Sequence, residues 1–215
     1  MTVVAIIPAR GGSKRIPRKN LAPVAGRPLL AHTLLQATAA EGVDEVIVST
    51  DDAEIAEVAE RFGAEVVWRP ASIAGDTATS ESALIHALDA RNEAGKDDPE
   101  LVVFLQCTAP VRRPGDIDGA IETLRERGAD SLLSGVRQAH FVWAERDGVL
   151  QSITYDHVAR PRTQDFEPQF TENGSLFVFK PEILRAHDNR LGGTVAMFEM
   201  DYWSSVDVDT PEHLQ

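Results

Sequence analysis

The stretch VVAIIPARGGSKRIPRKN, residues 3–20, decides the fold class of the chain. It begins with an apolar run, Val3–Ile7, that has the length and composition of a buried strand. Pro8 ends this run, and a basic loop that contains Gly11 and Gly12 follows. A strand that leads through such a loop into a helical pattern is the first unit of an α/β fold.

Similar units recur through the first two thirds of the chain. We expect strands over 3–7, 45–49, 65–68, 101–105 and 131–136, and helices over 29–37, 53–62, 80–94 and 115–127. Asp51 or Asp52 is the expected cap of the second helix. Continuously apolar strands joined by helices predict a mostly parallel sheet with helices on both faces. Ligands of such sheets bind at the carboxyl ends of the strands.

The pattern changes near residue 137. Residues 140–144 and 174–180 have the composition of strands, and a polar stretch with several prolines separates them. We interpret residues 137–180 as an inserted β-rich region, after which the chain returns to the main sheet at 205–208. All 215 residues are then one domain.

Charge is distributed unevenly along the chain. The net charge of -13 argues against a general partner among nucleic acids or anionic membranes. Residues 1–40, however, contain six basic residues and none of the 34 acidic ones. An acidic protein with one basic segment near its start is expected to bind a compact anion.

The chain shows no sign of export or of a membrane span. Cys107 is the single cysteine, so no disulfide forms within the chain. The apolar run at residues 3–7 is too short for a signal peptide or a membrane helix, and no other stretch is long enough. We therefore expect a soluble, cytoplasmic protein.

The loop over residues 8–20 is the candidate phosphate site. Its glycines let the backbone approach a ligand, while lysine and arginine add mobile and bidentate positive charge. Neither G-x-x-x-x-G-K-[ST] nor G-x-G-x-x-G is present. A solvated basic loop is the alternative, but the absence of acidic residues over residues 1–40 favours polyphosphate binding.

Asp207 and Asp209 are the candidate metal ligands. They lie two residues apart in an apolar segment, so strand periodicity would place both carboxylates on one face and Val206 and Val208 towards the core. Paired carboxylates bind Mg²⁺ well when phosphate oxygens and waters complete its coordination. The alternative is an acidic strand end that caps a helix starting near Thr210.

Several motifs in a fixed order resemble one family. They are Ile7-Pro8-Ala9-Arg10, Ser13-Lys14, Pro17, Lys19-Asn20, Ser49-Thr50-Asp51, Arg69-Pro70, Asp76-Thr77-Ala78, Leu105-Gln106, Pro110, Asn173-Gly174 and Asp207-Val208-Asp209. Together they resemble the CMP-sialic acid synthetases, or acylneuraminate cytidylyltransferases. The resemblance implies a three-layer Rossmann-like fold of the nucleotide-diphospho-sugar transferase type, with an inserted element that forms a homodimer.

The resemblance also implies a reaction and a set of roles. CMP passes from CTP to the anomeric hydroxyl of a nine-carbon keto-sugar acid, pyrophosphate leaves, and magnesium is the cofactor. Arg10, Lys19 and Asp209 would be catalytic, and Asp207 and Asp209 would hold the metal. The nucleotide would contact Ala9, Arg10, Gly11, Gly12, Ser13, Lys14, Lys19, Asn20, Arg69, Ala78 and Ser80. The sugar acid would contact Gln106, Arg162, Asn173 and Phe177.

Two positions depart from the family pattern. Cys107 stands where the family commonly has proline, and we interpret it as a packing residue. Phe177 stands where the sialic acid enzymes have tyrosine, so one hydroxyl contact to the sugar would be missing. No side chain stands out as a general base, although Asp209 or a metal-bound hydroxide could serve.

Other functions remain open at this stage. The acceptor could be pseudaminic, legionaminic, deaminated neuraminic or 3-deoxy-octulosonic acid. The chain could also be a non-catalytic nucleotide-sugar-binding protein, although such a protein has less need of the Asp207 and Asp209 pair.

Overall fold

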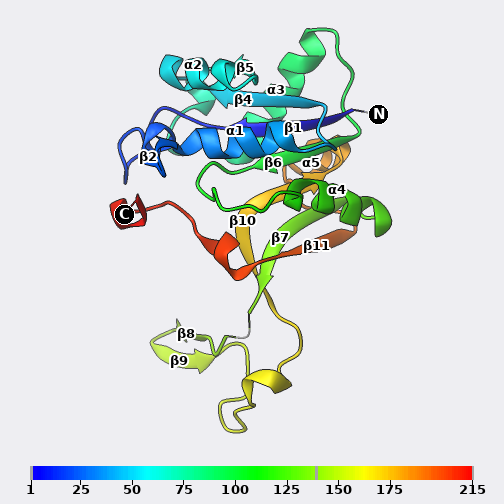
Figure 1. Cartoon of the computed structure of the whole chain (residues 1–215). Coiled ribbons are helices and arrows are strands. Elements are labelled where there is room, and N and C mark those ends of the chain that lie inside the picture. The colour runs from blue at the N-terminus through cyan, green and yellow to red at the C-terminus, as the bar shows by residue number, and fades with distance from the viewer. Residues whose placement is uncertain (1, 139, 215) are drawn as a thin grey trace.

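The computed structural model describes residues 2–138 and 140–214 as one α/β body with a projecting arm (Figure 1). The strands are β1 Val3–Pro8, β2 Pro23–Val24, β3 Arg27–Pro28, β4 Glu45–Thr50, β5 Glu65–Trp68, β6 Leu101–Leu105, β7 Ser131–Arg137, β8 Trp143–Arg146, β9 Val149–Ser152, β10 Phe170–Phe179 and β11 Val195–Met200. The α-helices are α1 Leu29–Ala39, α2 Ala53–Arg61, α3 Ser80–Glu93, α4 Asp116–Glu126 and α5 Pro181–His187. Short 3₁₀ turns are η1 Lys19–Leu21, η2 Ala71–Ile73, η3 Thr163–Asp165, η4 Tyr202–Ser205 and η5 Pro211–Leu214.

A seven-stranded sheet in the order β11-β7-β10-β6-β1-β4-β5 forms the centre of the fold. β1 pairs in parallel with β4 and β6, β4 with β5, and β7 with β11. β10 runs antiparallel to both of its neighbours, β6 and β7. The prediction of a mostly parallel sheet is confirmed.

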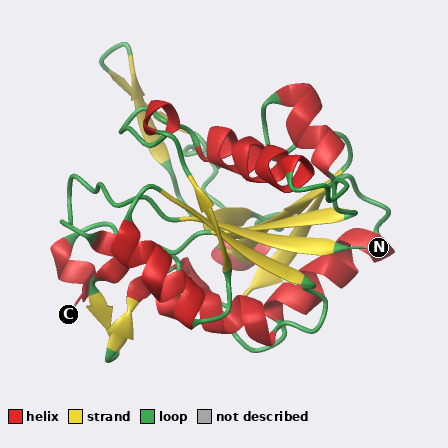
Figure 2. Ribbon diagram, turned by 90° about the horizontal axis from the view of Figure 1, so that it is seen from above, coloured by secondary structure: helices red, strands yellow, loops and turns green. Residues whose placement is uncertain are grey.

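Helices cover both faces of this sheet, which makes three layers (Figure 2). On one face, α1, α2 and α4 pack against alternate strand residues such as Ala5, Ile7 and Val103. On the other face, α3 and α5 pack against the intervening residues, among them Ile6 and Phe104. Both faces of the strands are therefore buried, which is why their sequences are continuously apolar.

The predicted helices and the first five predicted strands are all present within a few residues of their expected bounds. Asp52, rather than Asp51, caps α2, because its carboxylate accepts from the backbone N–H groups of Glu54 and Ile55. α5 and β11 are two elements that the sequence pattern did not predict. Met and Ala residues weaken the strand pattern of Val195–Met200. This edge strand is therefore recognised only from its pairing with β7.

The predicted strand at residues 205–208 is wrong. This segment has no partner in the sheet, and its contact is a hydrogen bond of 2.6 Å from the Val208 N–H to the carbonyl of Thr108. Val208 is buried with Ile16 and Leu29, whereas Val206 is 42% exposed. Val208 therefore anchors the C-terminal segment beside the basic loop.

The excursion from the sheet occupies residues 138–169 and is shorter than the expected 137–180. Phe170–Phe179 forms β10 within the sheet, so the described residues of the excursion comprise the β8–β9 hairpin, η3 and connecting loops. In Figure 1 it projects from the main body beyond the ends of β7 and β10. Among the described residues, no helix has both the length and the apolar composition to cross a bilayer.

Candidate active site

A cavity of about 290 Å³ opens at the carboxyl ends of the parallel strands. Pro8 ends β1 there, Arg69 follows β5, and Gln106 follows β6. The lining residues are Pro8, Arg10, Gly12, Ser13, Lys19, Asn20, Arg69, Ala78, Thr79, Ser80, Phe104, Gln106, Cys107 and Thr108. The fold thus brings most of the predicted nucleotide residues and Gln106 to the edge where the topology predicts a ligand.

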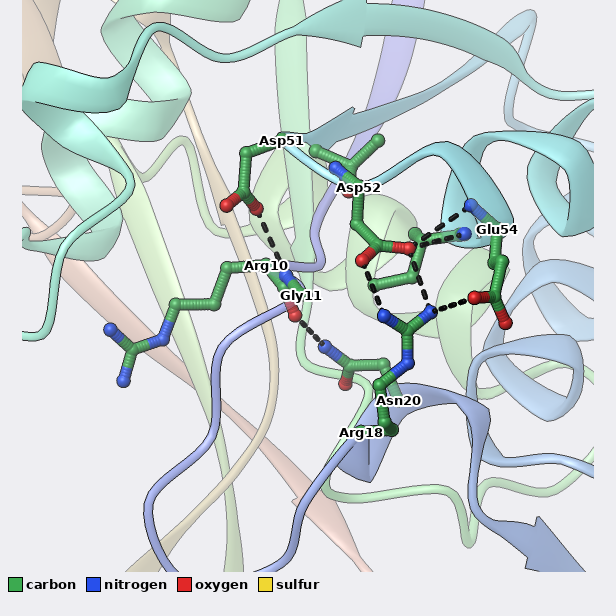
Figure 3. A network of polar contacts seen from close by, with 9 residues as sticks. Arg10, Gly11, Arg18, Asn20, Asp51, Asp52 and Glu54 are labelled. Atoms are coloured by element: carbon green, nitrogen blue, oxygen red, sulfur yellow. Dashed lines mark hydrogen bonds and ion pairs between the residues drawn. The ribbon is translucent and has the colours of Figure 1, made fainter.

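Gly11 lies where the basic loop passes closest to the start of α2. Its N–H donates to Asp51 Oδ1 at 2.9 Å (Figure 3). A Cβ atom at this position would lie 2.6 Å from Asp52 Oδ2 and 2.8 Å from Asp52 Cβ. The close approach of loop and helix start therefore requires glycine at this position.

Asn20 and Arg18 hold the shape of the loop. The buried side chain of Asn20 donates from Nδ2 to the carbonyl of Arg10 at 3.0 Å. The Arg18 guanidinium binds both carboxylate oxygens of Asp52, at 2.7 and 3.0 Å, and also pairs with Glu54 (Figure 3). The network turns Arg18 away from a direct phosphate role and ties the loop to α2.

Arg10 and Lys14 share one carboxylate. Arg10 Nη1 and Lys14 Nζ each lie 3.0 Å from an oxygen of Asp76, and Arg10 also donates to the Gly75 carbonyl at 2.8 Å. Hydrogen bonding from Lys14 lowers the pKa of Asp76, and Arg10 adds to this effect. Ala9 lies beneath the loop, fully buried, with its N–H bonded to the Ser49 carbonyl at 2.9 Å.

Asp209 pairs with two further cations of the loop. Its Oδ1 lies 2.8 Å from Lys19 Nζ, and its Oδ2 lies 3.3 Å from Arg15 Nη1. The hydrogen bond from Lys19 lowers the pKa of Asp209, so the carboxylate is ionised at neutral pH. Asp207 is exposed. Because residues 205–208 do not form a strand, strand periodicity does not place the Asp207 and Asp209 carboxylates on one face, as the sequence had predicted.

A second hollow of about 230 Å³ lies among these ion pairs. Its lining residues are Arg10, Ser13, Lys14, Arg15, Lys19, Asp76 and Asp209. It shares Arg10, Ser13 and Lys19 with the larger cavity. The basic loop therefore lines two adjoining spaces, which we call the inner cavity and the outer hollow.

Arg69 and the start of α3 also line the inner cavity. Arg69 is buried, and its guanidinium donates to Ser49 Oγ at 3.2 Å and to the Ser49 carbonyl at 2.8 Å. Burial lowers the pKa of Arg69, although an arginine remains charged at neutral pH. Thr79, not Ser80, caps α3 by accepting from the Ser82 N–H at 3.1 Å. The Ser80 hydroxyl is thus not required as a helix cap.

Arg112 holds the backbone around Gln106 and was not identified from the sequence. Its Nη2 donates to the carbonyls of Gln106 at 2.8 Å and Ser175 at 2.6 Å. Burial lowers its pKa to about 10. Nothing in the local sequence distinguishes this buried arginine from Arg113, which is an exposed residue paired with Asp201.

Two predicted sugar contacts need correction. Asn173 is 9% exposed and points into the protein, where Oδ1 accepts from Ser134 Oγ at 2.6 Å and Nδ2 donates to Ser204 Oγ at 2.9 Å. Phe177 is fully buried and stacks on Phe104 with 5.5 Å between ring centroids. Both side chains are occupied by the packing of β10, so neither lines the inner cavity.

Arg162 also lies apart from the inner cavity in this chain. It belongs to the excursion and pairs with Asp165 at 2.7 Å. Cys107, by contrast, lines the cavity wall but is 3% exposed. Burial raises the pKa of its thiol to about 12, so it is not a nucleophile and the packing interpretation agrees with its environment.

The fold and the site define a class. A three-layer α/β domain with a basic glycine-containing loop after β1, facing a polar cavity at the carboxyl edge of the sheet, is the architecture of a nucleotide-binding transferase. A model of the cytidylyltransferase family matches residues 4–200, and the chain belongs to this family.

Two relatives of known name agree with the family. The chain is 35% identical over 213 residues to the N-acylneuraminate cytidylyltransferase of Oncorhynchus mykiss, covering 96% of this chain but 47% of that protein. It is 32% identical over 223 residues to the CMP-N,N'-diacetyllegionaminic acid synthase of Legionella pneumophila, covering 98% and 92%. The chain thus spans about half the length of the vertebrate relative and most of the bacterial one.

The fold is shared with a solved enzyme of lower sequence similarity. The structure of a CMP:2-keto-3-deoxy-manno-octonic acid synthetase complexed with CTP superimposes with a TM-score of 0.70 at 19% identity, covering 99% of this chain and 95% of that one. At this identity the match supports the fold alone. The predicted fold class and the resemblance stated from the motifs are both confirmed.

Proposed function

We propose that this protein transfers CMP from CTP to the anomeric hydroxyl of a keto-sugar acid and releases pyrophosphate. The observation that carries the proposal is the inner cavity, which Arg10 and Lys19 of the basic loop line together with Arg69 and Ser80. Such a space accepts a nucleotide with its phosphates at the loop and its base at the start of α3. Family membership then favours cytosine as the base.

The phosphates have several positive partners within reach. Arg10, Lys14 and Lys19 would bind the triphosphate, with the backbone N–H groups of Gly12 and Ser13 as further donors. Catalysis would then depend on holding the α-phosphorus in line with the acceptor hydroxyl and on stabilising the charge of the transition state. Arg10 and Lys19 line both spaces and are the catalytic candidates for this charge stabilisation.

The base end needs groups that match cytosine. Cytosine offers an N4 donor and the O2 and N3 acceptors, so it needs a carbonyl together with hydroxyl or guanidinium donors. Arg69, the backbone of Ala78 and the Ser80 hydroxyl are of these kinds and line the same end of the cavity. Asn20 contributes by holding the Arg10 carbonyl, which fixes the loop beneath the nucleotide.

We propose that the C-terminal segment holds magnesium. Asp207 and Asp209 supply carboxylate oxygens, the ligand type that Mg²⁺ prefers, and Asp209 is held in its ionised form. Among the described residues there is no group of three or more His, Cys, Asp or Glu side chains that could enclose a metal. Phosphate oxygens would therefore complete the coordination, and the bound metal would neutralise the triphosphate and polarise the α-phosphorus.

The acceptor class follows from Gln106 and from the relatives. Gln106 follows β6 in the cavity wall, where its amide can both donate to and accept from sugar hydroxyls. The relatives act on N-acylneuraminate and N,N'-diacetyllegionaminic acid by their names, so a nine-carbon keto-sugar acid is our proposal for the acceptor. Phe177 is fully buried and does not line the cavity, so other residues would determine the selectivity among such acids.

The excursion supports a homodimer. It exposes Val149, Leu150 and Val158 at 58, 62 and 83%, although a solvated arm has no need of apolar side chains. A second copy is the partner that the family resemblance favours for this surface. We also propose a cytoplasmic location, which suits a protein with one buried thiol and a nucleotide substrate.

One assay tests the reaction. The protein is incubated with CTP, magnesium and each of a panel of sugar acids, namely N-acetylneuraminic, deaminated neuraminic, legionaminic, pseudaminic and 3-deoxy-octulosonic acid, and pyrophosphate is measured. Release with one acid, and none without an acid, is the expected result and identifies the acceptor. CTP binding without pyrophosphate release from any acid would instead indicate a non-catalytic nucleotide-binding protein.

A further inference from the structure

Asp76 lies between Arg10 and Lys14, the two cations that the proposed function assigns to phosphate binding. It lies in the loop between η2 and α3, and its two carboxylate oxygens contact Arg10 and Lys14 at 3.0 Å each. The side chain is 43% exposed, so neither burial nor a further side-chain partner among the described residues holds it in place. The ion pairs with the basic loop are therefore what position it.

The residues that line the inner cavity differ from those that line the outer hollow, and the proposed function places the nucleotide base in the inner cavity. Arg69, Ala78 and Ser80 line only the inner cavity, whereas Lys14, Arg15, Asp76 and Asp209 line only the outer hollow. Arg10 and Lys19 line both. A nucleotide whose base lies near Arg69 therefore directs its outer phosphates into the hollow that contains Asp76.

A carboxylate and a phosphate bind guanidinium and ammonium groups in the same way. Both are anions that accept charge-assisted hydrogen bonds, and both cannot take the same N–H groups at once. The Lys14 side chain is 74% exposed, so its ion pair with Asp76 is a surface pair that breaks at little cost in free energy. The outer phosphates and Asp76 are thus alternative partners for Arg10 and Lys14.

We propose that Asp76 is an internal competitor for the outer phosphates of the nucleotide. It holds Arg10 and Lys14 in place when no phosphate is bound, yields both cations to the outer phosphates, and binds them again as the diphosphate product leaves. Asp76 acts through these two cations and is therefore a positioning residue. The inference rests on the proposed function for the identity of the leaving group, but the competition itself applies to any diphosphate or triphosphate.

Calorimetric titration of the whole chain with pyrophosphate, CTP and CMP tests the proposal. All titrations use the same magnesium concentration. The variant Asp76→Asn keeps the size of the side chain and removes its charge. We expect it to bind pyrophosphate and CTP about three- to tenfold more tightly, which is the range for releasing one or two surface ion pairs. CMP, whose single phosphate ends in the inner cavity, should change by less than about twofold.

Two control variants separate the competition from general charge and from folding. Glu57→Gln removes the same charge from an exposed pair with Arg61 on α2, and should leave all three affinities unchanged. In Lys14→Met, one of the two competed cations is absent, so adding Asp76→Asn should produce a smaller gain than in the parent protein. Thermal unfolding of each variant confirms that the compared proteins are folded.

The titrations can contradict the proposal in several ways. Unchanged or weaker pyrophosphate binding by Asp76→Asn, or an equal gain for CMP, would overturn the proposal, as would an absence of pyrophosphate binding by all variants. Pyrophosphate inhibition of turnover should rise in Asp76→Asn by the same factor as the affinity. Because the titrations need no sugar acid, failure of the transfer reaction and failure of the Asp76 competition are observed separately.

Discussion

Asn173 shows how a single side chain can organise a strand. Its Oδ1 accepts from Ser134 Oγ and from the Ser175 N–H, and its Nδ2 donates to Ser204 Oγ. These bonds surround the irregularity in β10, where the register against β7 shifts between Glu172 and Phe177. An asparagine placed this way fixes the irregular part of β10 through its hydrogen bonds.

Replacement of Asn173 tests this structural role. Asn173→Ala leaves buried partners without hydrogen bonds, so we expect the free energy of unfolding to fall by about 1–3 kcal/mol. Chemical denaturation measures this change. A direct sugar contact predicts the opposite pattern, in which stability is unchanged and only the KM for the sugar acid rises.

The ionisation of Glu45 makes part of the free energy of unfolding depend on pH. The Arg91 hydrogen bond is the largest cause that lowers its pKa, and Lys96 adds to it. A carboxyl with a lowered folded pKa contributes stability above its unfolded pKa, and this contribution is lost as the pH falls through the folded pKa. Glu45→Gln should therefore cost about 2 kcal/mol at pH 7, since the buried Arg91 loses its partner.

Denaturation at several pH values checks this prediction. The deficit of Glu45→Gln relative to the parent protein should begin to shrink below the unfolded pKa of about 4.3, where the unfolded parent chain takes up a proton at Glu45. It should disappear as the pH falls through the lower folded pKa, where Glu45 becomes protonated in the folded parent as well. Glu57→Gln, which affects an exposed pair on α2, should show little deficit at any pH. A deficit that stays constant while the pH is lowered from 7 until the parent protein unfolds would show that Glu45 acts through packing rather than through charge.

At the scale of elements, the basic loop depends on the start of α2. Gly11 touches Asp51 and Asp52, and Arg18 reaches the same cap residue from the far end of the loop. Ile16 packs against Val208, which links the loop to the C-terminal segment. The loop is therefore held at three places, and its cations are positioned before any ligand binds.

Two neighbouring glycines provide a matched test of this arrangement. In Gly11→Ala the new Cβ would overlap the Asp52 carboxylate at 2.6 Å, so loop and helix must separate. We expect a loss of about 1–3 kcal/mol in stability and a clear loss of CTP affinity. Gly12→Ala places its Cβ in open space and should leave stability nearly unchanged. Equal behaviour of the two variants in denaturation would contradict the role assigned to Gly11.

At the scale of the whole molecule, the excursion projects from the α/β body and has packing of its own (Figure 1). Its aromatic side chains pack on one another, with Phe141 in edge contacts to Tyr155 and Phe166. Trp143 and Leu150 nevertheless remain 40 and 62% exposed on the hairpin. The arm thus has a small core of its own and an apolar surface that a second copy can cover.

Light scattering after size-exclusion chromatography tests the proposed homodimer. Leu150→Lys introduces a charge into the exposed face of β9, and we expect it to convert a dimer into a monomer because an unpaired lysine is costly to bury. Trp68→Lys places the same charge on β5, at the other side of the sheet, and should not alter the mass. A monomeric parent protein would contradict the proposal directly.

Local sequence determined most of the elements and the edge of the sheet at which the inner cavity opens. Runs such as Val3–Ile7 and Leu101–Leu105 reveal buried parallel strands because both of their faces are covered, and the carboxyl edge follows from that topology. Arg10, Lys19 and Arg69 were predicted as neighbours and do line one cavity. β11 could not be predicted in this way, because it is defined by its pairing with β7.

Tertiary structure alone decided which groups meet across the sheet. Arg15 and Asp209 are 194 residues apart in sequence, and Gly75 lies 65 residues from the arginine that binds it. Nothing in residues 3–20 identifies Asp76 as the shared partner of two cations, or shows that Asn173 points inward. Strand and helix formation depend on local periodicity, whereas ion pairs and burial depend on how the chain returns to the same edge of the sheet.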